Sequence, residues 1–355
     1  MSFKFDIIRS MNEINTNLLD ETVSKLLAKG KGILAADESN GTADKRLASI
    51  NVEGGEENRK KYRDLFLCMP DFGKYVSGVI MYDETFWQAD CSGTKTFPQK
   101  LQDNDVIPGI KVDLGAKDFP GFPDETLTIG LDDLGERARK YFKGGARFSK
   151  WRAVIKIDES KGLPTKESIE ANADALGRYA RIVQEAGLVP IVEPEVLLTG
   201  NHSIETAEKI TTYVVEQVFA KLNEYRAYVP GVILKTSMVI NGNANADEAS
   251  AEEVADATVR MLQTAVPKNV GGVVFLSGGQ TAVEATTHLD AIVEKGGLSF
   301  EIAFSYARAL QQPALRIWAG KDENIESARA EFKKRLELNQ LADSGDYDIK
   351  MEYLD

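Results

Sequence analysis

Lys235 lies at the centre of an apolar run, residues 231–239 (GVILKTSMV), which follows a Pro-Gly turn signal. Such a run of aliphatic and β-branched residues predicts a buried β-strand. An ammonium group is costly to bury among Val232, Ile233 and Leu234, and desolvation favours the neutral amine, which attacks carbonyl carbons. We therefore interpret Lys235 as a nucleophile that forms a Schiff base. The alternative is a strand-end lysine that reaches water or pairs with a carboxylate.

Three charged residues in or after other apolar runs have the chemistry that an imine reaction needs. Glu193 is the candidate acid and base, with a pKa that its apolar strand would raise. A salt bridge to Lys150 or Lys235 is its alternative role, and the two roles are compatible. Asp37 is the candidate for the substrate hydroxyl whose deprotonation drives carbon–carbon cleavage, although Asp before Glu-Ser is also an ordinary helix start. Lys150 is a second cation that would favour the neutral form of Lys235.

Two groups of residues have the composition of phosphate sites. Ser277, Gly278 and Gly279 follow the seventh apolar run, and Arg308 follows the eighth. Backbone N–H groups, a hydroxyl and a cation there would match the usual phosphate site of parallel barrels, although Ser-Gly-Gly is also a plain turn. The second group would hold a phosphate at the far end of a substrate and comprises Ser39, Thr42, Lys45, Arg46, Lys111 and Arg152. For Lys45 and Arg46 the alternative is a solvated basic face.

Eight apolar runs alternate with helical sequence and would position these side chains. The predicted strands are residues 33–36, 75–82, 110–112, 148–157, 189–196, 231–239, 270–279 and 300–306. The main predicted helices are residues 20–29, 56–68, 131–143, 166–185, 205–222, 251–264, 282–293 and 326–341, with a loop over 114–123. Continuous apolar strands with helical crossovers require a parallel sheet buried on both faces. Eight such units predict an α/β protein, a (β/α)8 TIM barrel.

The barrel predicts which side chains meet. Active sites of this fold lie at the carboxyl ends of the strands. Side chains alternate between the two faces of a strand, so Lys150 shares a face with Arg152, and Glu193 shares one with Glu195. If Lys235 faces inward, Lys150 and Glu193 on the two preceding strands can face it. Barrel interiors are normally aliphatic, so this gathering of charge favours chemistry over structural pairing.

Composition argues against several classes of protein. The 355 residues are 43% hydrophobic, which allows one large domain or two ordinary ones. The net charge of −12 gives no global positive field for nucleic acid or an anionic membrane. His202 and His288 are too few for the usual catalytic zinc site and are expected at the surface, so no metal is predicted. Cys68 and Cys91 allow at most one disulfide, which suits a reducing cytosol. No stretch approaches the ~18 to 20 apolar residues of a membrane span.

Motifs over nearly the full length resemble class I (Schiff-base) fructose-bisphosphate aldolase. In order they are GKGILAADESNGTADKRL, EENRKKYRDL, GVIMYDET, PGIKVD, KWRAVIKI, VPIVEPEV, ILKTSMV, FLSGGQ and SYARAL. The resemblance implies reversible cleavage of fructose 1,6-bisphosphate to dihydroxyacetone phosphate and glyceraldehyde 3-phosphate, without metal or cofactor. It also implies a cytoplasmic homotetramer in glycolysis and gluconeogenesis, with a phosphorylated sugar as its substrate.

The resemblance assigns roles residue by residue. Lys235 resembles the imine lysine and Glu193 the acid and base, with helper roles for Asp37, Lys150 and Glu195. Contacts to the phosphate beside the imine are expected from Ser277, Gly278, Gly279, Ser305 and Arg308. Contacts further along the substrate are expected from Ser39, Thr42, Lys45, Arg46, Arg59, Lys111 and Arg152.

The chain departs from the family pattern at three places. Thr236 and Ser237 follow the imine lysine where Pro-Asn is usual, and Ala307 stands where glycine is usual, so its methyl is expected to restrict the backbone beside the phosphate. Tyr353 is followed by two further residues, although many members end in tyrosine. Two alternatives remain open: another Schiff-base aldolase or transaldolase, and a phosphosugar-binding scaffold protein. The expected organisation is an N-terminal helical extension (1–30), the barrel (31–342) and a tail (343–355).

Overall fold

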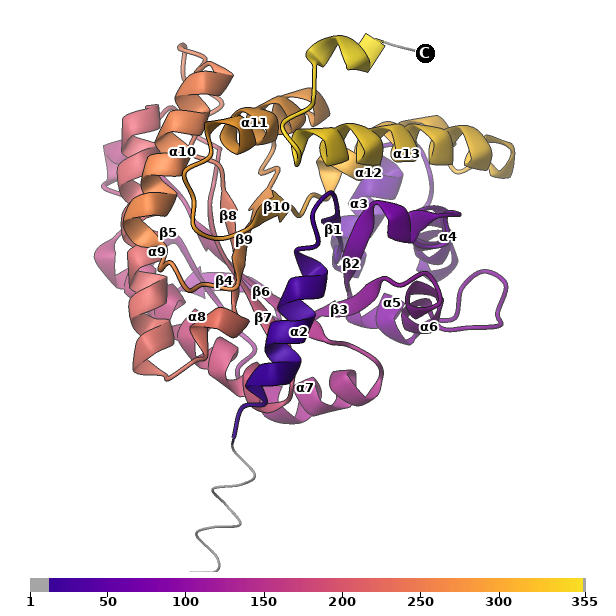
Figure 1. Ribbon diagram of the computed structural model, residues 1–355, viewed down its shortest axis with the longest axis horizontal. Helices are drawn as coiled ribbons and strands as arrows, with labels where there is room; N and C mark the ends of the chain where they lie inside the picture. The colour runs from indigo at the N-terminus through magenta and orange to yellow at the C-terminus, as the bar shows by residue number, and fades with distance from the viewer. Residues whose placement is uncertain (1–12, 354–355) are drawn as a thin grey trace, which may run out of the picture.

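A computed structural model describes residues 13–353, and its centre is a barrel of eight parallel strands with helices outside it (Figure 1). Neighbouring strands pair in the order β1 (Gly32–Ala36), β2 (Val76–Met81), β3 (Ile107–Lys111), β6 (Phe148–Ile155), β7 (Val189–Val196), β8 (Ile233–Ser237), β9 (Gly272–Leu276) and β10 (Ile302–Phe304). The backbone N–H of Ala35 donates to the carbonyl of Tyr306 at 3.0 Å, which brings the end of the last strand against the first. The predicted (β/α)8 TIM barrel is confirmed.

The helices of the outer layer are α3 (Asn40–Ala48), α4 (Glu56–Leu67), α5 (Asp83–Trp87), α6 (Phe97–Gln102), α7 (Leu134–Lys143), α8 (Lys166–Glu185), α9 (Ile204–Glu224), α10 (Ala251–Ala265), α11 (Ala282–Lys295), α12 (Arg308–Trp318) and α13 (Ile325–Ala342). Several begin at side chains that satisfy the first backbone N–H groups. Ser250 with Glu253, and Thr281 with Glu284, form capping boxes at α10 and α11. Among the described residues, no helix is both long and apolar enough to cross a membrane.

The sequence did not predict two elements correctly. The expected loop over 114–123 contains most of a hairpin of β4 (Ala116–Phe119) and β5 (Phe122–Thr128). Its strands are largely polar and lack the apolar run that signals a buried strand, and Phe119 stacks on Phe122 at 4.4 Å across the turn. Helix α12 was not predicted either, because Pro313 lies inside it and removes one backbone donor.

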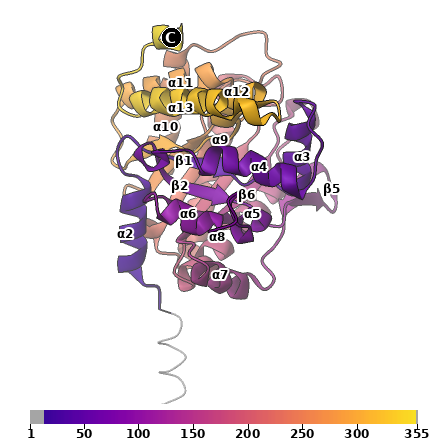
Figure 2. The ribbon, with the colours of Figure 1, turned by 90° about the vertical axis from the view of Figure 1, so that its right-hand side faces the viewer.

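Helix α2 (Thr16–Leu26) closes the amino end of the barrel, opposite to the β4–β5 hairpin (Figure 2). It begins at Thr16, four residues before the predicted start, and is capped by Asn15, whose side chain accepts the N–H of Leu18 at 3.2 Å. Its apolar face packs on inward-facing strand residues in one buried cluster, which includes Leu19, Leu26, Ile33, Ile80, Phe148, Ile191, Ile233 and Val274. Half of the barrel interior is therefore an ordinary apolar core.

Phe148 shows how tightly this amino-end core is packed. A Cβ atom added to Gly109 would lie 2.2 Å from the Phe148 ring, and one added to Gly78 would lie 3.0 Å from it. The two glycines on neighbouring strands therefore leave the space that the ring fills. Charged side chains lie only further along the same strands, towards their carboxyl ends.

Candidate active site

A cavity of about 790 Å³ opens at the carboxyl ends of the strands. Most of the residues predicted from the sequence line it: Asp37, Ser39, Thr42, Arg46, Lys111, Lys150, Arg152, Glu193, Glu195, Lys235, Ser277, Gly278, Ser305 and Arg308. Of the predicted residues, Gly279, Lys45 and Arg59 do not line it. The expected place of the site is thus where the barrel brings these side chains together.

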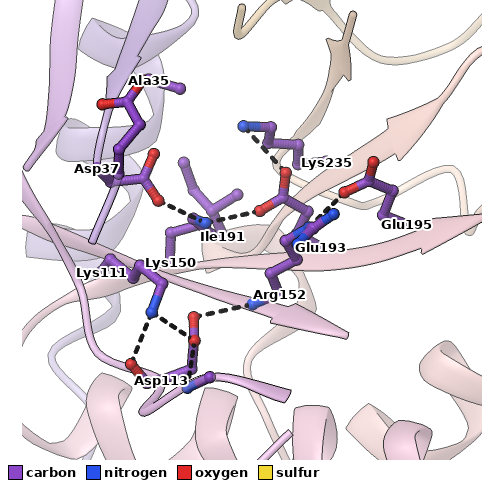
Figure 3. A network of polar contacts seen from close by, with 12 residues as sticks. Ala35, Asp37, Lys111, Asp113, Lys150, Arg152, Ile191, Glu193, Glu195 and Lys235 are labelled. Atoms are coloured by element: carbon purple, nitrogen blue, oxygen red, sulfur yellow. Dashed lines mark hydrogen bonds and ion pairs between the residues drawn. The ribbon is translucent and has the colours of Figure 1, made fainter. Parts of the chain in front are cut away.

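Lys235, Glu193, Lys150 and Asp37 form one chain of ion pairs across the cavity (Figure 3). Lys235 Nζ lies 3.1 Å from Glu193 Oε1, and Lys150 Nζ lies 2.9 Å from Glu193 Oε2. Lys150 Nζ also lies 2.6 Å from Asp37 Oδ2. Both lysines and Glu193 are each 3% exposed. Strand alternation turns all four side chains to the same interior, so the nucleophile candidate and its carboxylate meet directly.

The two cations decide the ionisation of the carboxyl groups. Burial would raise the pKa of Asp37, but Lys150 and Lys235 outweigh burial and hold it well below its usual range. Burial likewise opposes the charge of Glu193, yet the same two lysines lower its pKa. The expected raised pKa of Glu193 is therefore wrong for this arrangement. Burial would lower the pKa of Lys150, and the carboxylates of Asp37 and Glu193 raise it instead, so Lys150 stays charged.

A second charged group borders the first and contains Asp113, which sequence reasoning did not select as a site residue. Lys111 Nζ lies 2.6 Å from Asp113 Oδ1, and Asp113 Oδ2 accepts the backbone N–H of Arg152 at 3.3 Å. The guanidinium of Arg152 is paired with Glu195. Asp113 lies two residues after Lys111, at which β3 ends, and that position was the signal that could have identified it.

The first predicted phosphate group has an unpaired donor and a turn with two glycines at positive φ. Gly278 and Gly279 have φ angles of +56° and +110°, which glycine adopts without strain. Ser305 is 1% exposed, and its hydroxyl has no hydrogen-bond partner among residues 13–353. Arg308 begins α12 and approaches Gly279, because a Cβ at Gly279 would lie 3.7 Å from its guanidinium. Ala307 has φ −109° and ψ −82°, so it lies outside the left-handed region that favours glycine.

The second predicted phosphate group is only partly gathered. The hydroxyls of Ser39 and Thr42 lie 3.1 Å apart, and Arg46 lines the cavity beside them. Lys45 is exposed to solvent on α3. Arg59 donates to Glu84 at 2.6 and 2.8 Å, so it is already held by a carboxylate behind the cavity.

The two histidines are more deeply buried than the two cysteines. His202 and His288 are both buried, so the expected surface position is wrong, and burial lowers the pKa of each ring. His288 Nδ1 lies 2.5 Å from Gln280 Oε1 in a buried contact. Cys68 and Cys91 are free thiols. Within the described residues, no group of three or more His, Cys, Asp or Glu side chains is arranged to hold a metal ion.

A family model for class-I fructose-bisphosphate aldolase matches residues 18–354 of the chain. The chain belongs to this aldolase family. A fructose-bisphosphate aldolase of Dictyostelium discoideum is 44% identical to it over 338 residues, which cover 94% of each chain. The protein named fructose-bisphosphate aldolase 4, cytosolic, of Arabidopsis thaliana is 45% identical, over 96% of this aldolase and 86% of the relative.

A solved structure is similar to this aldolase in fold as well. It is the Plasmodium falciparum fructose-bisphosphate aldolase in complex with TRAP and a small-molecule inhibitor, with a TM-score of 0.92 and 44% identity. The match covers 94% of this aldolase and 95% of that chain. The chain is therefore a metal-independent lyase that reversibly cleaves fructose 1,6-bisphosphate to dihydroxyacetone phosphate and glyceraldehyde 3-phosphate through a lysine Schiff base, a glycolytic reaction.

Proposed function

We propose that Lys235 supplies the Schiff-base nitrogen of this aldolase and that Glu193 transfers the protons of imine formation. The observation that carries the proposal is the position of Glu193 between two buried ammonium groups, 3.1 Å from Lys235 Nζ and 2.9 Å from Lys150 Nζ. A carboxylate at hydrogen-bond distance from the nucleophile can take its proton and return it.

Imine formation begins when Glu193 takes a proton from the ammonium of Lys235. The neutral amine attacks the C2 ketone of the open-chain sugar, and a carbinolamine forms. Glu193 then protonates the departing hydroxyl, which leaves as water, and the nitrogen remains as a protonated imine. Charge and protons balance, since an ammonium and a ketone give an iminium ion and water.

The electrostatics of the site change during this sequence. Two cations lower the pKa of Glu193, and the first proton transfer neutralises one of them, Lys235. The buried carboxyl then regains part of the pKa that burial gives it, so it can hold the proton until the carbinolamine needs it. Lys150 keeps its charge next to Glu193 and Asp37 and holds both carboxyl groups in place.

Carbon–carbon cleavage uses the imine as an electron sink. Asp37 accepts the proton of the C4 hydroxyl, the C3–C4 bond breaks, and its electron pair moves toward the iminium to give an enamine. Glyceraldehyde 3-phosphate leaves as the aldehyde. Protonation at C3 and hydrolysis of the imine release dihydroxyacetone phosphate and restore Lys235. In this proposal Glu195 assists by fixing Arg152, with which it is paired.

The two phosphate groups of the substrate are assigned to the two ends of the cavity. The phosphate beside the imine is bound by Ser277, Gly278, Gly279, Ser305 and Arg308. The distal phosphate is bound by Ser39, Thr42, Arg46, Lys111 and Arg152, with Lys45 and Arg59 at its margin. The unpaired Ser305 hydroxyl supports the first assignment, and the cationic lining supports the second.

The assembly and location of the enzyme belong to the same proposal. We assign the chain to a cytoplasmic homotetramer, and the name of the Arabidopsis relative supports the location. Light scattering should give a mass near four times the 39.0 kDa of one chain.

Borohydride trapping tests the assignment of Lys235. The enzyme is incubated with fructose 1,6-bisphosphate and sodium borohydride, and the modified peptide is mapped by mass spectrometry. We expect one reduced adduct, on Lys235, and no adduct or turnover in Lys235→Met. Lys150→Met is the matched control, because it removes the neighbouring buried lysine and should retain the adduct at a lower rate. An adduct on Lys150 alone, or normal cleavage by Lys235→Met, would refute the assignment.

A further inference from the structure

Arg46 is tied to the protein through one corner of its guanidinium group. Its NH1 atom donates to the hydroxyl of Tyr62 at 3.0 Å and also pairs with the carboxylate of Glu38. Both donors of this one nitrogen are thus used by protein side chains. The Nε and NH2 atoms have no hydrogen-bond partner in the described part of the chain, and these two atoms form the edge that binds a phosphate through two parallel bonds.

A directed chain of hydrogen bonds fixes this corner. The Ala35 carbonyl can only accept, so the Gln311 amide nitrogen must face it, at 2.7 Å. The Gln311 oxygen therefore faces Tyr62, whose hydroxyl donates to it at 2.5 Å. Tyr62 has used its proton there, so its lone pairs face Arg46. Each bond determines the direction of the next.

This chain of hydrogen bonds is buried, which restricts its motion. Tyr62 and Gln311 are both 0% exposed, and the guanidinium of Arg63 lies over the Tyr62 ring, 4.8 Å from its centre. Burial raises the pKa of Tyr62, so the phenol keeps the proton that the chain requires. Arg63 also pairs with Glu38, which prevents Glu38 from following Arg46 freely.

The same chain of hydrogen bonds links elements that carry residues of both proposed phosphate groups. Gln311 lies three residues after Arg308 on α12, the helix that begins at the phosphate group beside the imine. Ala35 lies on β1, two residues before Asp37. Arg46 lies on α3, lines the same cavity and is assigned to the distal phosphate in the proposed function. Tyr62 and Gln311, which do not line the cavity, thus connect Arg46 to the helix that begins at Arg308.

We propose that Tyr62 and Gln311 are positioning residues that hold the phosphate-binding edge of Arg46 in the cavity and so favour a sugar with two phosphates over one with a single phosphate. The proposal rests on the assignment of Arg46 to the distal phosphate. Without the Tyr62 hydroxyl, Arg46 keeps only Glu38 as a partner. The attraction between the two opposite charges then turns the guanidinium toward Glu38, because no second acceptor holds it in place.

Steady-state kinetics of Tyr62→Phe with two substrates test the proposal. The variant removes one oxygen atom and keeps the ring against Arg63. We expect the KM for fructose 1,6-bisphosphate to rise about tenfold, the effect of one lost hydrogen bond to a charged group. The KM for fructose 1-phosphate, which has no distal phosphate, should change less than about twofold. Gln311→Met should also raise the ratio of the KM for fructose 1,6-bisphosphate to the KM for fructose 1-phosphate, which we call the substrate ratio.

Two further variants distinguish a positioning role of Tyr62 from a general structural role. Tyr75→Phe is the matched control, because Tyr75 donates to Glu337 at 2.9 Å beside the amino end of β2 and should leave the substrate ratio unchanged. In an Arg46→Met background, Tyr62→Phe should add no further rise in the KM for the bisphosphate, since it acts through Arg46.

The outcomes distinguish this inference from the proposed function. If Arg46→Met changes the substrate ratio and Tyr62→Phe does not, the positioning role is overturned and the distal assignment stands. Equal losses with both substrates in Tyr62→Phe would also overturn it, because they would indicate a general structural defect. If Arg46→Met leaves the ratio unchanged, the distal assignment itself fails, and the inference fails with it.

Discussion

The two ends of the barrel interior are built from the same strands and differ in almost every physical respect. At the amino end, Ile33, Phe148, Ile233 and their neighbours form an apolar core that α2 covers. At the carboxyl end, inward positions on the same strands carry buried ionic groups around a cavity of about 790 Å³. The first arrangement stabilises the fold. The second buries charge, which lowers stability, and provides the groups that the chemistry needs.

Buried carboxyl groups make the same contrast visible. Asp37 and Glu193, at the carboxyl end, are beside lysines, and their pKa values are lowered. Asp343 packs near the amino end, where its carboxylate accepts the backbone N–H of Gly30 at 3.1 Å, and burial raises its pKa to about 7. The carboxyl pKa is lowered where a cation is the hydrogen-bond partner and raised where none is.

Lys150→Met should have the largest effect, because it leaves Asp37 and Glu193 without their shared cation. We expect kcat to fall by about 10²- to 10⁴-fold. The free energy of unfolding at pH 7 should fall by about 3 to 5 kcal/mol, since two buried carboxylates lose one of the two lysines that compensate their charge. Urea unfolding and steady-state kinetics measure the two effects. Lys156→Met, which removes the half-buried cation 3.6 Å from Asp158, is the control and should change both little.

The pH dependence of this defect has a definite sign. In the wild type the folded pKa values of Asp37 and Glu193 lie below their ordinary values of 3.8 and 4.5. These groups therefore stabilise the fold above about pH 4.5, and that contribution is lost as the pH falls through the folded pKa values. The stability gap between the wild type and Lys150→Met should narrow in acid. A gap that stays constant from about pH 5 down to about pH 2 would contradict this account.

Phe148→Ala tests the opposite end, where the loss should be in stability and not in chemistry. Phe148 is fully buried and fills the space left by Gly78 and Gly109, so its removal creates a cavity. We expect the free energy of unfolding to fall by about 3 to 4 kcal/mol, with kcat within about threefold of the wild type at temperatures where the variant is folded. A tenfold loss of kcat in folded protein would show that the two ends are not independent.

Asp343→Asn should have a smaller, pH-dependent effect. Because the folded pKa of about 7 lies above the ordinary 3.8, the folded state binds more protons between these values, and stability falls as the pH rises from about 4 to 7. The variant should lack this fall and be more stable than the wild type at pH 8, by about 2 to 4 kcal/mol. Asp346→Asn, at an exposed carboxylate nearby, is the control. Parallel pH profiles for the wild type and Asp343→Asn would disprove the explanation.

Strand periodicity explains how much of the site could be predicted. Continuous apolar runs indicated the parallel barrel, and alternation of faces indicated that Lys150, Glu193 and Lys235 would share its interior. Alternation does not specify distances, so the sign of the Glu193 pKa shift, which depends on cations at 2.9 and 3.1 Å, could not be derived.

Side-chain pairs between distant parts of the sequence could not be predicted either. Tyr62 and Gln311 are 249 positions apart, and no local pattern links them. Arg59 is matched to Glu84, 25 positions away, which keeps it from lining the cavity. Such pairs depend on how helices pack around the barrel and not on the periodicity of any one element.

Ala307→Gly should have the smallest effect and tests whether a departure from the family pattern matters at the carboxyl end. Because the φ of −109° lies outside the left-handed region that favours glycine, removing the methyl should change the KM for fructose 1,6-bisphosphate by less than about threefold. Gly278→Ala is the contrasting variant, because φ of +56° strains alanine, and it should raise KM more. If Ala307→Gly lowered KM tenfold, the methyl would be an obstacle to the phosphate itself and not a constraint on the backbone.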